Sequence, residues 1–391
     1  MKNLFLSLSV LFLTSWNAQA LKLILLSNHD NAGDHNQVLG IAAALENIAS
    51  PKITTEDLNT KTISLKEIQA QVNNDLLQGK VIIIGAGEGG IHGITDLSPS
   101  PNLIICLTSH MFLKEFANPT LLNKVSFFAL PSHATEEAKA IFGSKLIETT
   151  GVSHNRQANI VTQVYNKWEK QELPQNCSKY LGVILGGDAP TLTKDIQLFT
   201  EQDAVKLATF TAKMVANACV LVLNGPRTGK HDANKQEIKT VHRQGYSDRI
   251  TELFQKELIA QGIKNMKVFD FQHDTKMPYN SFDLVIGAVK AKDGTIIVPG
   301  ESTSMISEAI DTLPAKSVLI YEDSAMNEAH RAHVESELTA GRASILKNYC
   351  EIEVPSLNSS EPKAGAAKVI AEKLWQAASS SHFVNIIPFQ S

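Results

Sequence analysis

The sequence predicts an α/β protein with two Rossmann-like domains that face each other across a cleft. Short apolar runs typical of buried parallel strands alternate with stretches of helical periodicity. A polar, proline-containing segment over 174–178 interrupts this alternation and indicates a linker. The loops that follow strands are polar in both halves, where ligands of open α/β sheets bind. The predicted segments are a signal peptide over 1–20, an N-terminal Rossmann-like domain over 21–175, a C-terminal Rossmann-like domain over 176–350, a linker and helix over 351–378, and a disordered tail over 379–391.

The first twenty residues have the pattern of a secretory signal peptide. Lys2 supplies a positive charge, an apolar run follows over 4–13, and Ala18-Gln19-Ala20 fits a cleavage site. We therefore expect an exported protein, periplasmic or secreted. No other segment is long and apolar enough to cross a bilayer, so no stable membrane span is expected after cleavage.

Charge and cysteine content narrow the range of partners. The chain has 36 basic and 40 acidic residues, a net charge of −4, and the basic residues are dispersed, so no nucleic-acid partner is expected. The spacing of the four cysteines indicates neither a zinc site nor a redox motif. Cys106 and Cys219 lie in apolar runs and are expected in the core. Export would permit a bond between Cys177 and Cys350, with free buried thiols as the alternative.

The N-terminal half begins with a predicted strand over 21–26 and a polar loop that leads into a helix. This loop is dense in hydrogen-bonding side chains and must lie beyond the carboxyl end of a strand. Gly33 and Asn36 are therefore candidate substrate-binding residues, and Asp34 and His35 are candidate general bases. The alternative is a solvated loop whose side chains cap the helix.

Gly85, Gly87 and Gly90 form a G-x-G-x-x-G pattern after a buried run. The following segment lacks long helical periodicity, and no acid follows at the distance typical of a dinucleotide site. We therefore expect no nicotinamide cofactor, and no other cofactor or metal is indicated. Predicted strands over 103–107 and 125–130 end near His110 and His133, and His110 is a third candidate base; structural histidines are the alternative.

The C-terminal half repeats the alternation, with predicted strands over 180–185, 218–223 and 266–271 and a helix near 247–261. Gly187 and Asp188 close the first of these strands. Arg227, Thr228 and Lys230 follow the second at spacings that exclude a P-loop, and they are candidate phosphate contacts. The alternative is a loop whose charges bind no ligand.

A later segment over 295–308 has the clearest binding pattern. An apolar strand over 296–298 ends at Pro299-Gly300, and Ser302, Thr303 and Ser304 stand where the next helix begins. A helix start offers unpaired N–H groups and a positive dipole end, which favour an anion. Glu308, about a turn further along, is a candidate acceptor for a sugar hydroxyl. A strand over 317–321 and helices near 327–340 and 364–377 complete the prediction.

This segment resembles the donor site of GT-B glycosyltransferases such as lipid-A-disaccharide synthase, in which the helix start takes the diphosphate and the acid takes the ribose. Motifs across residues 21–350 are also similar to the mitochondrial-fission ELM (elongated mitochondria) family. They occur in the same order at Ala32–Gly40, Leu185–Asp188, Arg227-Thr228, Pro278-Tyr279 and Glu301–Ala309. The resemblance implies a GT-B-like fold and a nucleotide-sugar or glycan ligand.

The chain departs from the family at Pro226, where an arginine is usual, and in its signal peptide, because the family is mainly cytosolic. Our leading hypothesis is a metal-independent glycosyl transfer from a nucleotide-sugar or phosphosugar. A non-catalytic binding protein on the same scaffold is the first alternative, and a nucleotide-sugar epimerase or hydrolase is the second. The sequence does not indicate an oligomeric state.

Overall fold

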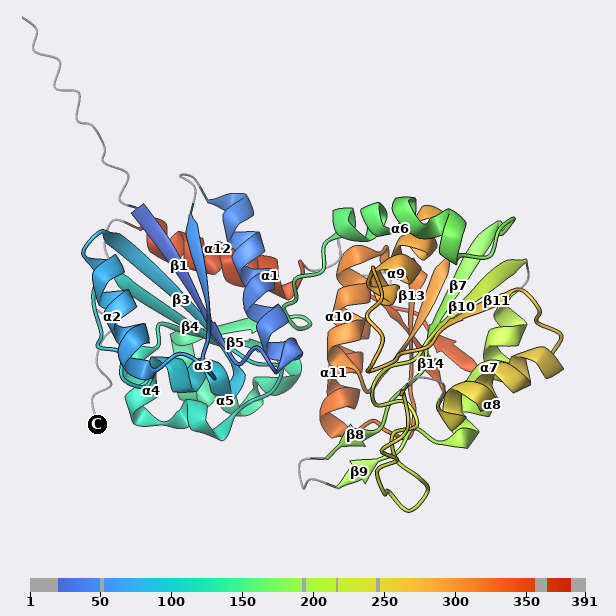
Figure 1. The fold of residues 1–391 in the computed structure, drawn as a ribbon. Coiled ribbons are helices and arrows are strands. Elements are labelled where there is room, and N and C mark those ends of the chain that lie inside the picture. Colours follow the sequence, from blue (N-terminus) through green and yellow to red (C-terminus); the bar gives the residue numbers. More distant parts are fainter. Residues whose placement is uncertain are drawn as a thin grey trace, which may run out of the picture.

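A computed structural model describes residues 20–49, 53–191, 195–215, 217–243, 247–355 and 364–380 (Figure 1). Residues 1–19 of the expected signal peptide and 381–391 of the expected tail lie outside the described residues. No described helix is long and apolar enough to cross a membrane.

The first domain is built on a parallel sheet with strand order β2-β1-β3-β4-β5-β6. Its strands are β1 (Ala20–Ser27), β2 (Thr54–Asn59), β3 (Gly79–Ala86), β4 (Leu103–Thr108), β5 (Phe127–Pro131) and β6 (Leu146–Thr149). Its helices are α1 (Ala32–Ile48), α2 (Leu65–Leu76), α3 (Gly87–Ile94), α4 (Pro119–Lys124) and α5 (Glu136–Phe142), with short 3₁₀ turns η1 (Lys114–Ala117), η2 (Ser132–Ala134) and η3 (Gly143–Lys145).

Strand β1 shows why this sheet is covered on both faces. Side chains alternate between the faces of a strand, so Leu23 and Leu25 point one way and Ile24 and Leu26 the other. The first pair belongs to a core shared with α1, and the second to a separate core on the opposite face. A strand that is buried on both sides reads as one continuous apolar run, which is how the sequence identified it.

The second domain has the strand order β11-β10-β7-β12-β13-β14-β15, parallel except for the β14–β15 pair. Its strands are β7 (Lys179–Ile184), β10 (Ala218–Leu223), β11 (Met266–Phe269), β12 (Thr295–Pro299), β13 (Val318–Tyr321), β14 (Ser344–Lys347) and β15 (Glu351–Glu353), and a separate antiparallel pair comprises β8 (Ala189–Pro190) and β9 (Ile196–Gln197). Its helices are α7 (Glu201–Met214), α8 (Arg249–Ala260), α9 (Ser281–Ala291), α10 (Thr303–Thr312) and α11 (Glu328–Thr339), with the 3₁₀ turn η4 (Ala315–Ser317).

Two further helices stand next to the two points where the chain crosses from one domain to the other. Helix α6 (Ala158–Glu172) packs beside α9, and its Val161 and Tyr165 lie in the core of the second domain. Helix α12 (Ala366–Ser379) returns to pack on α1, with Ile370 and Leu374 in the core of the first domain (Figure 1). The predicted division at residue 175 therefore separates α6 from the sheet on which it packs.

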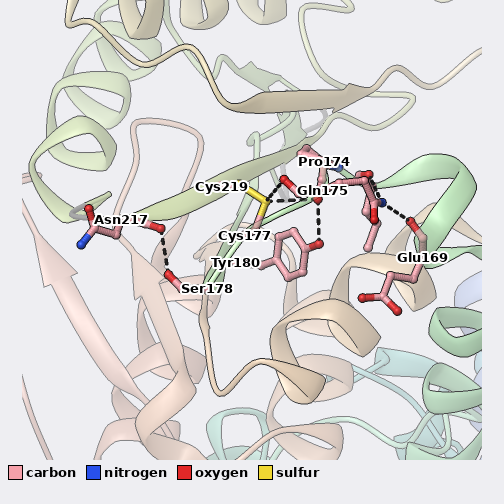
Figure 2. Close-up of a disulfide and its surroundings, with 9 residues drawn as sticks. Glu169, Pro174, Gln175, Cys177, Ser178, Tyr180, Asn217 and Cys219 are labelled. Carbon is pink, nitrogen blue, oxygen red and sulfur yellow. Dashed lines mark hydrogen bonds between the residues drawn. A yellow bond between two sulfur atoms is a disulfide. The ribbon is translucent and has the colours of Figure 1, made fainter.

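The disulfide differs from the sequence-based expectation. Cys177, just before β7, is bonded to Cys219 in the neighbouring strand β10 (Figure 2). Cys350 is an exposed free thiol and Cys106 a buried one, so a Cys177–Cys350 bond was the wrong pairing. Because strand pairing sets Ala218 beside Lys179, it brings the residues that flank these strands close together, and the linear sequence does not show that proximity.

The predicted fold class is confirmed, since two parallel α/β sheets are each covered by helices and interdomain hollows of about 640 and about 330 Å³ lie between the domains. One local prediction was wrong. Helix α3 follows β3 directly at Gly87, in a stretch where helical periodicity was not recognised. Four of its eight residues are buried glycines or Ile94, so the buried face offers little apolar periodicity to detect.

Candidate functional site

Helices α10 and α11 form the side of the second domain that faces the first (Figure 1). Each begins just past the carboxyl end of a strand, β12 or β13, and runs back toward the opposite edge of the sheet. Residues three or four apart share one face of a helix, so each helix presents one row of side chains to the boundary. These rows run from Ser304 through Ser307 and Glu308 to Asp311 on α10, and from His330 through His333 to Ser336 and Glu337 on α11.

Arg227 and Glu301 form an ion pair at the carboxyl edge of the second sheet. The Arg227 Nη2 donates to Glu301 Oε2 at 2.6 Å, and the Gly187 N–H donates to Oε1 at 2.8 Å. Burial raises the pKa of Glu301, and the positive charge of Arg227 partly offsets that rise. The Arg227 side chain is 41% exposed, and its Nη1 also donates to the Asp188 carbonyl oxygen at 3.4 Å. A guanidinium has five N–H donors, so donors remain for a ligand.

Several predicted binding residues instead support the Arg227 loop. A Cβ on Gly187 would lie 2.7 Å from the Arg227 Cβ, so only glycine allows this approach. The Asp188 carboxylate accepts from the backbone and ring of His231 at 2.9 and 3.0 Å. Thr228 is fully buried, and its Oγ1 accepts from the Gly225 N–H at 3.1 Å.

Lys230 lies in the same loop with its Nζ 3.2 Å from Glu237 Oε1. Both side chains are exposed, at 38% and 55%, so solvent screens the pair. Lys230 is therefore a weaker candidate phosphate contact than Arg227.

The start of α10 lies where the sequence predicted it. Ser302 is the N-cap and Thr303 the first helical residue, directly after β12. Ser302, Thr303 and Ser304 are partly exposed, and the Ser302 side chain caps no backbone N–H among the described residues. The hydroxyl groups and the first N–H groups of the helix therefore stand at the same sheet edge as Arg227.

Three histidines gather at this end of the boundary. His133 Nε2 lies 3.1 Å from the carbonyl oxygen of His110, which follows β4. Burial lowers the pKa of His110, and it lowers that of His133 to about 4. The pKa of His330 is lowered to about 4, chiefly by burial and then by the charges of Arg227, His110 and His133. The histidines of the first domain thus lie within electrostatic reach of α11 in the second.

The hydrogen bonds of His330 define its tautomer. Its Nδ1 accepts from the Asn327 backbone N–H at 3.2 Å, within the capping box of α11. A neutral ring whose Nδ1 accepts must carry its proton on Nε2. His330 therefore offers a neutral N–H donor, and His110 offers an uncharged imidazole able to accept a proton near neutral pH.

Glu308 lies in the middle of the boundary and already has a partner. The Arg156 Nε donates to Glu308 Oε2 at 2.8 Å, and Arg156 also pairs with Asp283 and packs over the Phe282 ring. Next to it, Ser307 Oγ accepts from the Val152 N–H at 2.9 Å. Glu308 thus holds the connecting segment against α10, a contact that the sequence did not indicate.

Asp34, His35, Gly33 and Asn36 lie at the start of α1, two strands away from His110 in the sheet order. Asp34 packs against Gly87, and burial together with the nearby Glu88 raises its pKa to about 6. His35 Nδ1 lies 3.0 Å from Ser27 Oγ, and its ring contacts His29. Gly33 is exposed and Asn36 partly so. The predicted bases therefore fall into two separate groups along one sheet edge.

The far end of the boundary holds a buried charge network. Arg342 is 1% exposed and donates to Asp311 at 2.7 Å and to the Thr150 carbonyl at 3.3 Å. Its Nε lies 2.9 Å from Glu337 Oε2 without hydrogen-bond alignment. His154 adds a second contact to Asp311 at 3.1 Å. The cavity of about 640 Å³ adjoins this network and not the carboxyl edges, so we place no chemistry there.

Sequence reasoning missed Glu301 and His330 as site residues. Glu301 lies inside the motif already recognised, and its burial could be expected only from the fold. His330 and His333 are three residues apart in a predicted helix, a spacing that places both on one face. That spacing was the available signal.

No protein-family model and no curated protein matches the chain. Among solved structures, the chain is similar to a glycosyltransferase from Rickettsia africae, with 9% identity over 93% of this chain and 90% of the other and a TM-score of 0.43. It is also similar to S. aureus MnaA solved with UDP (11% identity, 93% and 89%, TM-score 0.37) and to WaaG, a glycosyltransferase of lipopolysaccharide biosynthesis (11%, 93% and 96%, 0.33). These TM-scores are too low to carry an argument. The class of this protein, two Rossmann-like domains that share an interface, therefore rests on its own strand orders.

Proposed function

We propose that this protein binds a nucleotide-sugar or phosphosugar at the carboxyl-edge end of its interdomain boundary and transfers the glycosyl group to an acceptor. The observation that carries the proposal is the partly exposed Arg227 side chain, held by buried Glu301 at the sheet edge where α10 begins. Arginine forms two parallel hydrogen bonds to phosphate oxygens, and helix N-termini bind anions. Together they would stabilise a departing diphosphate.

The first domain supplies the proton acceptor in this proposal. His110 is kept neutral by burial and lies close enough to interact with His330 across the boundary. The acceptor hydroxyl gives its proton to His110 while its oxygen bonds to the sugar carbon and the diphosphate departs. The His330 Nε2–H donates a hydrogen bond to an oxygen of the departing diphosphate. His35 and Asp34 lie further along the edge, so His110 is the base we propose.

Membership of the ELM family and export from the cytoplasm are part of the same proposal. The meeting of three separate motifs in space supports family membership, because Gly187 and Arg227 both bond Glu301. The Cys177–Cys219 bond supports the second, because such bonds persist in oxidising compartments.

Calorimetric titration with UDP, UDP-sugars and uridine tests the phosphate role of Arg227. We expect Arg227→Ala to weaken UDP binding by about 10- to 100-fold, the value of a lost charge-assisted pair, with uridine binding little changed. The matched control is Arg243→Ala, which removes an exposed arginine of the same domain paired with Asp274. Equal losses for UDP and uridine would exclude a phosphate contact, and no binding of any nucleotide would refute the transfer proposal.

A second variant pair tests Glu308. We expect Glu308→Ala to abolish binding of UDP and of uridine alike if its carboxylate takes the ribose, with exposed Glu328→Ala on α11 as the control. Arg156→Ala separates direct binding from positioning, because it removes the partner of Glu308 and leaves the carboxylate. The same loss in both variants would make Glu308 a positioning residue.

A non-catalytic binding protein is the alternative favoured by one observation. Arg227 and Glu308 are both already paired within the protein, which reduces the charge that a ligand would meet. Binding of UDP-sugars without turnover in the parent protein would support this alternative, whereas loss of turnover in His110→Ala with unchanged UDP-sugar binding would support transfer.

A further inference from the structure

We propose that His29, His35 and Asp57 bind a divalent transition-metal ion, with zinc as the ion that fits best. The three residues come from the loop after β1, the first turn of α1 and strand β2. One ligand atom of each lies within 4.8 Å of the others. This site is independent of the proposed glycosyl transfer.

The fold brings the three residues together for a simple reason. Leu23 and Leu25 of β1 face α1, so the alternation of the strand places Ser27 on the same face. In the parallel register Leu25 stands beside Asp57, which therefore also points toward α1. His35 descends onto this face from the helix, and the Asn59 side chain holds the His29 backbone N–H at 3.3 Å.

The distances leave room for a tetrahedral ion. His29 Nε2 is hydrogen-bonded to Asp57 Oδ1 at 3.2 Å, and His35 Nε2 lies 3.5 Å from the other carboxylate oxygen, Oδ2. Zinc bonds of about 2.0–2.1 Å at tetrahedral angles separate neighbouring ligand atoms by about 3.3–3.4 Å. An octahedral ion with bonds of that length would bring adjacent ligands to about 3.0 Å. Two imidazole nitrogens and one carboxylate form a ligand set that suits zinc better than magnesium, which prefers oxygen ligands.

The surroundings of His35 also favour a cation. Its Nε2 is too far from Asp57 Oδ2 for a good hydrogen bond. Its Nδ1 lies 3.0 Å from the buried Ser27 hydroxyl, which can orient the ring as a hydrogen-bond partner behind a metal ligand. When Ser27 Oγ accepts a hydrogen bond from Nδ1–H, the Nε2 lone pair is left facing Asp57 and is free to bind an ion.

The site is accessible and incomplete, as a zinc site with an open position would be. His29, His35 and Asp57 side chains are 30%, 21% and 32% exposed. Three protein ligands leave a fourth position for water or substrate. The site lies at the carboxyl edge of the first sheet. Strands β1 and β4 are about 10 Å apart in this sheet, and His110 follows β4.

A second group, His242, Asp248 and Asp270, meets the same distance criterion but does not fit as well. The Asn224 amide nitrogen already donates to both carboxylates of this group, 2.8 Å from Asp248 and 2.5 Å from Asp270. The Phe271 N–H donates to the other end of that amide and fixes its orientation. A donor group therefore already stands where an ion would have to bind.

The test is a metal titration of the full protein, purified without a histidine tag and stripped with EDTA. Zinc affinity is measured by competition with a coloured chelator, and cobalt is added separately because its visible absorption reports tetrahedral geometry. We expect one equivalent of zinc. His29→Ala and His35→Ala should each weaken affinity by more than about 100-fold, and Ser27→Ala by about 10-fold, with the fold of each metal-free variant checked by circular dichroism.

His92→Ala is the matched control, because it removes an exposed histidine of the same domain from α3. Its zinc affinity should equal that of the parent protein. Absence of stoichiometric binding, or unchanged affinity in His29→Ala, would overturn the proposal. So would loss of the zinc equivalent in His242→Ala with retention in His29→Ala and His35→Ala.

Discussion

His330 and Glu337 lie about two turns apart on α11, and they have opposite environments. His330 stands near Arg227 and two other histidines, a set of groups that all favour loss of its proton. Glu337 stands near Arg342, with Asp311 beyond it. The carboxyl-edge end of the boundary therefore holds Arg227 and histidines with lowered pKa values, whereas the far end holds Arg342 next to the carboxylates of Glu337 and Asp311.

This difference separates two uses of the same residue types. At the far end Arg342 is buried, and its two terminal nitrogens bond Asp311 and the Thr150 carbonyl, so it helps to hold Thr150 of the first domain against the second. At the carboxyl edge Arg227 is half exposed and its charge remains partly available to a ligand. Exposure of the arginine, and not its presence, distinguishes a structural contact from a binding group.

Breaking the far end should have the largest effect on stability. Arg342→Ala leaves the buried Glu337 carboxylate without its cation, and we expect a loss of about 3–5 kcal/mol in the free energy of unfolding. Arg249→Ala is the control, because that arginine is 78% exposed and its pair with Glu201 should contribute about 0–1 kcal/mol. Urea denaturation measures both, and similar losses would mean that the far end is not a stabilising network.

The pH dependence of stability should have opposite signs at the two ends. Burial first, with Asp311 adding and Arg342 opposing, raises the pKa of Glu337 from 4.5 to about 7. The native state then binds more protons than the unfolded state between these values, so this group lowers stability as pH rises from 4.5 through 7. We expect Glu337→Gln to remove this fall, worth about 2–3 kcal/mol, in unfolding measured across that range.

His330 should act in the other direction. Its pKa falls from 6.5 to about 4, so the unfolded state binds more protons between these values and stability rises with pH through that range. We expect His330→Gln, which preserves a capping-box residue, to remove a rise of about 2 kcal/mol after solvent screening. An unchanged slope below pH 6.5 would show that His330 does not titrate as its surroundings imply.

The smallest effect concerns one pair of hydroxyl groups across the boundary. Ser132 Oγ lies 2.6 Å from Ser336 Oγ, a hydrogen bond between the two domains. Ser132→Ala should lower the free energy of unfolding by about 1 kcal/mol. Adding Ser336→Ala should lower it little further, because the first substitution already removes the hydrogen bond that the two hydroxyls share. Ser380→Ala, which removes an exposed hydroxyl from the end of α12, should stay within about 0.5 kcal/mol. Strictly additive losses would mean that the two hydroxyls do not interact.

Local sequence signals predicted the parts of this fold that depend on local physics. The apolar run of β12, the Pro299-Gly300 break and the hydroxyl residues placed the start of α10 correctly, because capping and strand burial act over a few residues. Strand β2 was missed, since its residues are exposed or half-buried and lack the apolar run of a central strand. Without that strand, nothing in the sequence places Asp57 next to His35.

The parts of the site that depend on long-range contacts could not be predicted. Arg227 was singled out for its charge after a strand, but its partner Glu301 lies 74 residues away in sequence. The pairing of Cys177 with Cys219 depends on β7 and β10 being neighbours, and nothing local indicates that order. Arg156 meets Glu308 only because the segment between the domains folds back onto α10.

The return of α12 to the first domain has a mechanical consequence. The chain passes from the first domain at residues 154–159 and is back beside α1 at 365–368, and both stretches line the same cavity next to Arg342. Two bodies joined at two neighbouring points have one easy relative motion, a rotation about the line through those points. Because that line lies at the far end of the boundary, a small rotation about it would open or close the opposite end, where Arg227 and His110 both lie near His330, by the greatest distance.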